Sequence, residues 1–293
     1  MVGPDPRRHD VPIAGVSALL GIPVPTIRSW ERRYGFPSPP RTRGRHRRYS
    51  EHEIEQLRGV RDLITKGFAA AEAVRRVDLA RGGRTGAELV ERIVDAAMAL
   101  DAARLDAGLD RGAAELGLER SIAEVALPAM REIGATWKAG MCGVDHEHLA
   151  TQVVRAWLAR QGPPAGPGPG RDPIVLACGP SDMHTIALEG FGVLLATRGR
   201  SATVLGALTP TEALVAAVRS LRSPAAVVTC QRSVTRKAAV ASIEAVAAIP
   251  GVRAFYAGEG FASPSARSGV PGEFLGDDLL AAARTVVSAT ARA

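Results

Sequence analysis

Residues 11–34 read VPIAGVSALLGIPVPTIRSWERRY, and this stretch decides the fold of the N-terminal part of the chain. Apolar residues recur at helical spacing over residues 13–20, and Gly21 then ends the helix. Pro25 suits the first turn of a second helix, which we expect over residues 26–34. Two short helices joined by a glycine-containing turn predict a helix-turn-helix.

A basic run, RTRGRHRRY, follows at residues 41–49. The proline-rich residues 36–40 cannot continue a helix, so the basic run suits a hairpin or wing. The sequence SEHE at 50–53 has the pattern of a capping box that opens a third helix, and a further short helix is expected at 68–77. These elements together predict a winged helix-turn-helix domain over residues 11–80.

The positive charge of the chain is concentrated at one end. Residues 1–50 contain ten arginines and three acidic residues, so this segment accounts for the whole formal net charge of +7. A charge excess confined to one end favours a module that binds a polyanion such as promoter DNA. The alternative reading of the charge alone is a disordered basic arm.

The arginine side chain suits DNA because its fork donates two parallel hydrogen bonds to a guanine edge or a phosphate. Arg28 and Arg32 are four residues apart and share a helix face, whereas we expect Trp30 to pack in the core. The wing arginines and Tyr49 are expected to contact phosphates and supply affinity. The expected DNA-binding residues are Thr26, Arg28, Arg32, Arg33, Arg43, Arg45, Arg47, Arg48 and Tyr49.

Length and composition exclude several classes of protein. A chain of 293 residues with 46% hydrophobic residues can bury two or three cores. We expect no membrane span, because no apolar run reaches about 18 residues, and no secretory signal, so the expected location is the cytoplasm. Cys142, Cys178 and Cys230 are odd in number and widely spaced, which argues against a disulfide framework or a zinc site.

The middle of the chain has a helical pattern almost throughout. A linker is expected at 81–86 and a glycine- and proline-rich linker at 162–170. Between them the pattern predicts a four-helix bundle over residues 87–161. Its helices are expected near 87–98, 101–116, 118–136 and 146–160.

After the second linker the pattern alternates between strand and helix. Strands are expected at 174–177, 202–205, 226–229 and 253–256, with a fifth at 273–275, and helices at 184–198, 211–222, 233–248 and 277–292. This alternation predicts a doubly wound parallel sheet, Rossmann-like or flavodoxin-like, over residues 172–293. The expected fold class is therefore multidomain α and α/β. In such a sheet a ligand binds at the carboxyl ends of the strands, near the topological switch point.

The N-terminal motifs resemble those of the MerR family of transcription regulators. They are IAGVSALLGI at 13–22, TIRSWERRYG at 26–35 and RHRRY at 45–49. The resemblance covers roughly residues 11–80. It implies a winged helix-turn-helix, a dimer and a palindromic operator. Regulators of this family differ in the sensor behind this domain, so the rest of the chain must identify the signal.

One histidine stands out in the C-terminal domain. His184 is the only histidine beyond the second linker, and it is expected at the mouth of the sheet. Asp182, two residues earlier, could orient its imidazole as carboxylates do for metal-bound histidines. The alternative is an ordinary histidine in a surface loop. The bundle holds Trp137 and then, after nine residues, Glu147 and His148.

A bundle carrying Trp-x(9)-Glu-His, followed by a sheet domain carrying Asp-x-His, resembles the cobalamin-binding regulators of the CarH and LitR type. This resemblance extends over essentially the whole chain. It implies that His184 is the lower axial ligand to cobalt and that Asp182 hydrogen-bonds its other nitrogen. It also implies that Trp137 covers the upper face of the corrin, and that Glu147 and His148 shape the pocket around an adenosyl group.

Further positions after the strands resemble this family, with departures. Thr229, Gly258 and Gly260 are expected to bind the cofactor, the glycines by allowing a close approach of backbone to ligand. Ala187 puts a methyl group where the family has glycine, close to the expected path of the nucleotide tail. Gln231 puts a polar group where an apolar one is usual.

The resemblance implies a repressor that uses adenosylcobalamin to respond to light as a homodimer or homotetramer. Some light sensors of this type have a cobalt-capturing histidine directly after the tryptophan, and Lys138 occupies that position here. The first alternative is a MerR-type regulator that senses another ligand or a protein partner. The second is an enzyme, a corrinoid methyltransferase or mutase component, which the DNA-binding N-terminus disfavours. The operator, repression versus activation, and the cobalamin form remain open.

Overall fold

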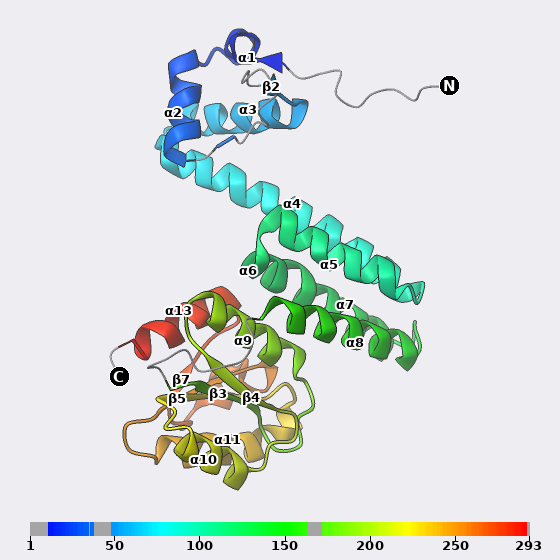
Figure 1. Ribbon diagram of the computed structural model, residues 1–293, viewed down its shortest axis with the longest axis vertical. Coiled ribbons are helices and arrows are strands. Elements are labelled where there is room, and N and C mark those ends of the chain that lie inside the picture. The colour runs from blue at the N-terminus through cyan, green and yellow to red at the C-terminus, as the bar shows by residue number, and fades with distance from the viewer. Residues whose placement is uncertain (1–10, 35, 38–47, 163–171, 292–293) are drawn as a thin grey trace. The chain divides into compact units, whose positions relative to one another are not determined.

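The computed structural model of the protein describes residues 11–34, 36–37, 48–162 and 172–291. The chain forms two compact units, residues 1–85 and residues 86–293 (Figure 1). Most of the expected wing and the linker residues from 163 onward lie outside the described residues. No helix in the described part of the chain is long and apolar enough to cross a membrane.

The N-terminal unit contains the helix-turn-helix expected from the sequence. Gly21 ends the first helix in a left-handed conformation (φ 67°), and its N–H donates to the carbonyl of Ser17. Ser50 and Glu53 form the expected capping box at the third helix. The elements are β1 (Val11–Pro12), α1 (Ile13–Leu20), α2 (Val24–Tyr34), β2 (Arg48–Tyr49) and α3 (Glu51–Thr65), with β1 and β2 antiparallel.

Helix α4 (Ala70–Met98) continues without a break through residues 81–86. The predictions of a short helix at 68–77 and a linker at 81–86 are therefore wrong. Each glycine costs a helix only about 1 kcal/mol relative to alanine, and residues of good helix propensity flank this segment on both sides. The boundary between the two compact units falls inside this helix, between Thr85 and Gly86.

The helical bundle follows its sequence pattern closely. Helix α5 is Ala102–Leu116 and helix α8 is Val144–Gln161. Between them, α6 (Leu118–Ser121), the π-helical segment η1 (Ile122–Ala126) and α7 (Leu127–Lys138) follow one another without a gap. Helix α8 packs against both α5 and α7.

The C-terminal part is a five-stranded, all-parallel sheet with the strand order β4-β3-β5-β6-β7. This is the flavodoxin-like order, which confirms the expected doubly wound fold. The strands are β3 (Ile174–Cys178), β4 (Ala202–Gly206), β5 (Ala225–Thr229), β6 (Arg253–Ala257) and β7 (Glu273–Phe274). The helices are α9 (Ile186–Thr197), α10 (Thr211–Ser220), α11 (Arg236–Ala247), α12 (Pro264–Arg267) and α13 (Leu279–Ala289), with short turns η2 (Ser233–Thr235) and η3 (Glu259–Phe261).

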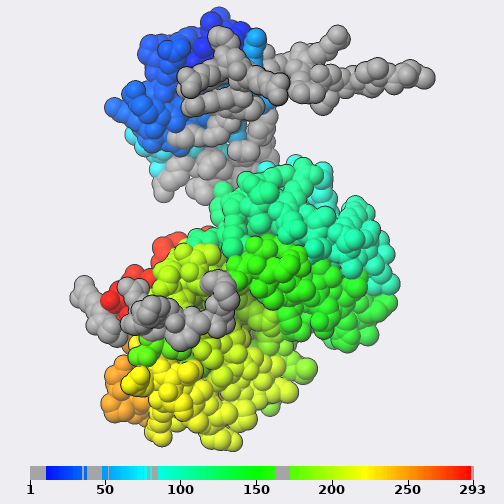
Figure 2. Space-filling model, viewed as in Figure 1, coloured from blue at the N-terminus to red at the C-terminus, as the bar shows by residue number. Residues whose placement is uncertain are grey.

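Helices cover both faces of the sheet, with α9 and α13 on one face and α10 and α11 on the other (Figure 1). The first face shares a single apolar core with the bundle, which includes Ile122, Trp157, Leu158 and Phe191. Helix α9 therefore lies between the bundle and the sheet, and the two layers are in direct contact (Figure 2). At Gly190 a Cβ atom would lie 3.0 Å from Ile122 Cγ2, so a larger residue would push this layer apart.

Candidate functional site

The carboxyl edge of the sheet contains the topological switch point. Strand β3 lies between β4 and β5, and the connections from β3 to β4 and from β4 to β5 use helices on opposite faces. The loop that follows β3, residues 179–185, thus begins at the position where ligands bind in open parallel sheets. This loop carries Asp182 and His184.

Asp182 holds three loops of this edge together. Its side chain is 1% exposed, and its Oδ1 accepts the backbone N–H of His184 at 3.0 Å and lies 2.7 Å from His184 Nδ1. Its Oδ2 accepts the N–H of Gln231, in the loop after β5, at 2.5 Å. Its carbonyl accepts the N–H of Leu208, in the loop after β4, at 2.8 Å. One residue therefore sets the relative positions of the loops after β3, β4 and β5.

The imidazole of His184 has the surroundings of a metal ligand. Its side chain is 53% exposed, and the buried carboxylate of Asp182 holds Nδ1. This contact fixes the ring orientation and leaves Nε2 as the nitrogen that can bind a metal ion. Cys178, at the end of β3, donates its thiol to the His184 carbonyl at 3.6 Å. An oriented, half-exposed imidazole of this kind is able to coordinate a metal-containing ligand from the solvent side.

The loops around His184 expose large apolar side chains. Met183 is 70% exposed, Leu208 50% and Val234 76%, and they follow β3, β4 and β5 respectively. Ser181 and Leu208 also adopt positive φ angles, 68° and 52°, which non-glycine residues rarely do and which cluster at functional sites. An apolar rim around one oriented imidazole suits a large, flat ligand with a metal at its centre.

The bundle residues expected to face the cofactor lie at one end of the α7–α8 hairpin. Trp137 is 44% exposed, and His148 is exposed on the first turns of α8. Glu147 accepts a hydrogen bond from the Thr151 hydroxyl at 2.8 Å and lies 3.8 Å from His148 Nε2. Within the described residues, no hydrogen bond joins these three side chains to His184, so their action on a shared ligand stays a prediction.

The three other expected cofactor residues have structural partners within the protein. The buried Thr229 hydroxyl donates to Cys178 Sγ at 3.5 Å. A Cβ atom on Gly258 (φ 107°) would lie 2.3 Å from the Cys230 carbonyl, and one on Gly260 would lie 2.7 Å from Cys230 Sγ. The need for glycine thus arises from the protein's own loop after β5, a contact that the sequence pattern did not reveal.

The departures from the family pattern also have defined positions. Ala187, on the first turn of α9, is partly buried against the core shared with the bundle. The Gln231 side-chain oxygen accepts the N–H of Glu259 at 3.4 Å and so connects the loops after β5 and β6. Lys138 is the last residue of α7.

Sequence reasoning missed the bonds of Gln231 and Leu208 to Asp182, because backbone N–H groups leave no side-chain signature.

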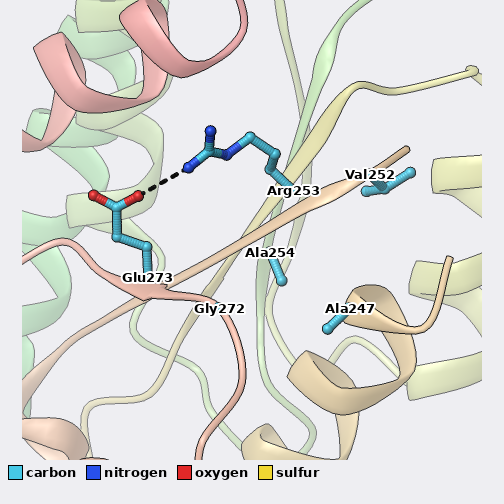
Figure 3. Close-up of a pocket in the computed structure, with 6 residues that line it drawn as sticks. All are labelled: Ala247, Val252, Arg253, Ala254, Gly272 and Glu273. Atoms are coloured by element: carbon cyan, nitrogen blue, oxygen red, sulfur yellow. Dashed lines mark hydrogen bonds and ion pairs between the residues drawn. The ribbon is translucent and has the colours of Figure 1, made fainter. Parts of the chain in front are cut away.

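A separate cavity of about 340 Å³ lies at the opposite edge of the sheet (Figure 3). Arg253, the first residue of β6, forms an ion pair with Glu273 there, with an N···O distance of 3.2 Å. Because the cavity adjoins the amino end of β6, it is not part of the site around His184. Its lining residues are Ala247, Val252, Arg253, Ala254, Gly272 and Glu273.

The second helix of the helix-turn-helix presents a basic face. Arg28, Arg32 and Arg33 are exposed on α2, whereas Ile27 and Trp30 are buried. The expected core role of Trp30 is confirmed. An exposed row of arginines on the second helix of this motif has the placement of a DNA recognition surface.

The prediction that Tyr49 contacts a phosphate is wrong in this structure. Tyr49 is fully buried, and its hydroxyl donates to Glu31 Oε1. The pairing of β2 with β1 turns this side chain into the core, away from solvent. Thr26 is partly buried and Arg48 is exposed, while Arg43, Arg45 and Arg47 lie outside the described residues.

Fold and site together define a helix-turn-helix DNA-binding protein with a helical bundle and a C-terminal α/β domain. Residues 11–78 match the MerR HTH family regulatory protein model, and residues 89–160 match the B12 binding domain model. The chain is 33% identical over 214 residues to the HTH-type transcriptional repressor CarA of Myxococcus xanthus, covering 72% of this chain and 73% of that protein. It is 34% identical over 231 residues to the repressor CarH of the same organism, covering 74% and 76%.

The chain therefore belongs to the MerR family of transcriptional regulators, in the group that includes CarA and CarH. The chain is similar in fold to the Methanosarcina barkeri monomethylamine corrinoid protein, with a TM-score of 0.53 and 14% identity over 69% of this chain and 98% of that one. The match to the B12 binding domain model supports a corrinoid as the class of cofactor.

Proposed function

We propose that this protein is a transcriptional repressor whose operator binding and oligomerisation are controlled by adenosylcobalamin and light. The observation that carries the proposal is the half-exposed His184 imidazole, oriented by the buried Asp182 within an apolar rim at the switch point. Similarity to two repressors over about three quarters of the chain supports the same function.

On the sheet side, His184 would hold the cobalt through Nε2. Asp182 would hold the Nδ1–H of His184, which fixes the tautomer and leaves Nε2 to coordinate the metal. Met183, Leu208 and Val234 would pack against the apolar edge of the corrin. Thr229, Gly258 and Gly260 would shape the loops that surround it.

On the bundle side, Trp137, Glu147 and His148 would hold the adenosyl group of the cofactor. Adenosylcobalamin, when bound, supplies a cobalt–carbon bond that light can break. The three bundle residues would pack on the adenosyl group in the dark and lose this contact after illumination. Their loss of contact would shift the population of bundle positions and weaken the oligomer that binds the operator. Lys138 stands where some such light sensors have a cobalt-capturing histidine, so this position would offer no imidazole to the metal.

At the DNA end, the exposed arginines of α2 would read base edges in the major groove and the wing would contact phosphates. A homodimer or homotetramer would place two such helices on the half-sites of a palindromic operator. The proposed DNA-contacting residues are Thr26, Arg28, Arg32, Arg33, Arg43, Arg45, Arg47 and Arg48.

The direct test is an absorption spectrum of the purified protein mixed with adenosylcobalamin, before and after green light. We expect stoichiometric binding, a spectral change on illumination, and reduced oligomer size and operator affinity afterwards.

Asp182→Asn should weaken cobalamin binding roughly 10- to 100-fold, as loss of a carboxylate partner does at metal-bound histidines. His184→Ala should weaken it further, whereas the matched control His146→Ala should bind normally.

A protein that stays colourless after incubation with every cobalamin form and removal of the free cofactor would refute the proposal. That outcome would favour the alternative, a MerR-type regulator that senses a different ligand or a protein partner. The Gln231–Glu259 bond between the loops after β5 and β6 is the feature that speaks for this alternative, because it occupies polar groups close to the expected cofactor edge.

A further inference from the structure

Arg155 on helix α8 connects the bundle to the loop that carries His184. Its Nε donates to both Glu189 carboxylate oxygens, at 3.1 and 3.3 Å, and its terminal nitrogen donates to the Thr185 hydroxyl at 3.0 Å. Thr185 directly follows His184 and is 6% exposed, and its carbonyl accepts the Glu189 N–H at 2.8 Å. The guanidinium therefore binds both ends of the first turn of α9.

A second polar contact joins the bundle to the other end of the same helix. Glu119, on α6, accepts hydrogen bonds from the Thr197 hydroxyl and the Arg198 guanidinium, both at 2.7 Å. These two contacts hold α9 at its beginning and at its end. Only the Arg155 contact adjoins the residue proposed to bind cobalt. Comparing the Arg155 and Glu119 contacts therefore separates local effects on the His184 loop from general effects on α9.

Helix α8 also has fixed contacts inside the bundle. The Trp157 indole N–H donates to Asp110 at 2.9 Å, and Arg160 donates to Asp106 at 2.6 Å. Both acceptors lie on α5. A displacement of α8 would therefore move α5 with it, and α8 carries Glu147 and His148 in its first turns.

We propose that Arg155 is a positioning residue that keeps the His184 loop in place and couples this loop to the helical bundle. This inference rests on the proposed function and names the residue through which the two halves of that site act on each other. An arginine suits the role because its planar fork binds a carboxylate and a hydroxyl simultaneously in a fixed geometry. Any change in the position of His184 shifts Thr185, which alters the bonds to Arg155 and thereby the position of α8.

The first experiment uses the cofactor-free full-length protein and measures backbone hydrogen exchange. Arg155→Met keeps the length of the side chain but removes its donors, and it should speed exchange of the amides of His184, Thr185 and Glu189 by about tenfold. The matched control Glu119→Gln should speed exchange only near Thr197. Equal effects of both variants on the His184 loop, or no effect of Arg155→Met, would overturn the proposal.

The second experiment measures coupling in the protein loaded with adenosylcobalamin. Arg155→Met should reduce the ratio of dark to light operator affinity by about tenfold, a coupling change within the usual range between linked sites. The absorption spectrum should also show a smaller fraction of histidine-bound cobalamin. Arg155→Lys can still pair with Glu189. It should therefore recover part of the affinity ratio and part of the histidine-bound fraction, which a purely structural defect would not allow.

A double-mutant cycle distinguishes a direct effect of Arg155 on the His184 loop from a general loss of stability. Thr185→Val removes the hydroxyl at nearly constant volume and should make the Arg155→Met effect smaller than it is in the original chain. Additive effects would contradict a direct coupling.

If Arg155→Met does not fold, the Thr185→Val and Arg155→Lys variants provide the same comparison. If no variant and not even the unchanged chain binds cobalamin, the proposed function fails, while the exchange experiment still decides whether Arg155 holds the loop.

Discussion

The buried hydroxyl of Tyr49 donates to Glu31, so packing gives this side chain a role different from the one that its basic neighbours indicate. Tyrosine beside several arginines is a common arrangement for phosphate binding. Strand β2 alternates its side chains, however, and places Arg48 in solvent and Tyr49 in the core. At the scale of single residues, the pairing of two very short strands decides which neighbour can reach DNA.

This arrangement makes opposite predictions for the two residues. Tyr49→Phe should lower the free energy of unfolding by about 1–2 kcal/mol, because a buried hydrogen bond to a carboxylate is lost. It should leave the salt dependence of operator binding unchanged. Arg48→Ala should leave stability nearly unchanged and reduce the slope of log affinity against log salt by about 1. Urea unfolding measures the free energy of unfolding, and DNA binding at several salt concentrations measures the slope. A reduced slope for Tyr49→Phe would contradict the structure.

Cys178 beneath the His184 loop yields a prediction about pH. Burial raises the pKa of this thiol to about 11, which keeps it neutral and able to donate to the His184 carbonyl. Because the folded pKa lies above the ordinary value of 9.0, the thiol contributes full stability below pH 9 and loses it as the pH rises towards 11. The rise of this pKa from 9.0 to about 11 corresponds to at most about 2.7 kcal/mol.

The difference in unfolding free energy between the original chain and Cys178→Ala isolates this contribution from other groups that titrate at high pH. That difference should shrink between pH 9 and pH 11. A constant difference over this range would show that the thiol does not titrate as its burial requires. Cys142→Ala, at a partly exposed thiol, serves as the control.

At the scale of elements, helix α4 is the main departure from the sequence pattern. Residues 81–86 contain three glycines and were expected to form a linker, yet they continue the helix. Local glycine content cannot predict this outcome, because residues of α4 on both sides of the segment pack in apolar cores, Val74 in one and Leu89 in the other. The tertiary contacts at the two ends of α4 thus override the weak local preference.

Substitution of one glycine distinguishes a helix from a linker here. In a helix, Gly83→Ala should raise the free energy of unfolding by about 0.5–1 kcal/mol, and Gly83→Pro should lower it by about 3 kcal/mol. In a flexible linker, both substitutions should have little effect. Thermal unfolding of the two variants decides between these outcomes, and equal stabilities would contradict a continuous α4.

At the scale of the whole molecule, the bundle and the sheet share one apolar core. Ile122 is fully buried in this core and packs close to Gly190 on α9. The layer between the bundle and the sheet therefore consists of fully buried side chains, as a protein interior does. The bundle can move relative to the sheet only by breaking contacts in this shared layer.

Ile122→Ala tests the shared core. It should lower the free energy of unfolding by about 2–5 kcal/mol, as truncation of a buried isoleucine does. Hydrogen exchange should speed up in both the bundle and α9, but not in α1 and α2 of the other compact unit. An effect confined to the bundle would show that bundle and sheet unfold independently.

Much of this architecture follows from local patterns. The capping box at Ser50, the glycine end of α1 and the alternation of strands and helices after residue 172 are each encoded within a few neighbouring residues. The motif around His184 also predicted its contact with Asp182, because two residues of spacing suffice for a carboxylate to reach the imidazole of its neighbour.

The tertiary structure alone decided what depends on residues far apart in the chain. The bond of Asp182 to Gln231, the contact of Gly258 with Cys230, and the bridge from Arg155 to Thr185 join residues that are 28 to 49 positions apart. Periodicity and capping report a residue's own element, whereas such contacts depend on strand order and helix packing. Only the assembled sheet and bundle bring these groups within bonding distance.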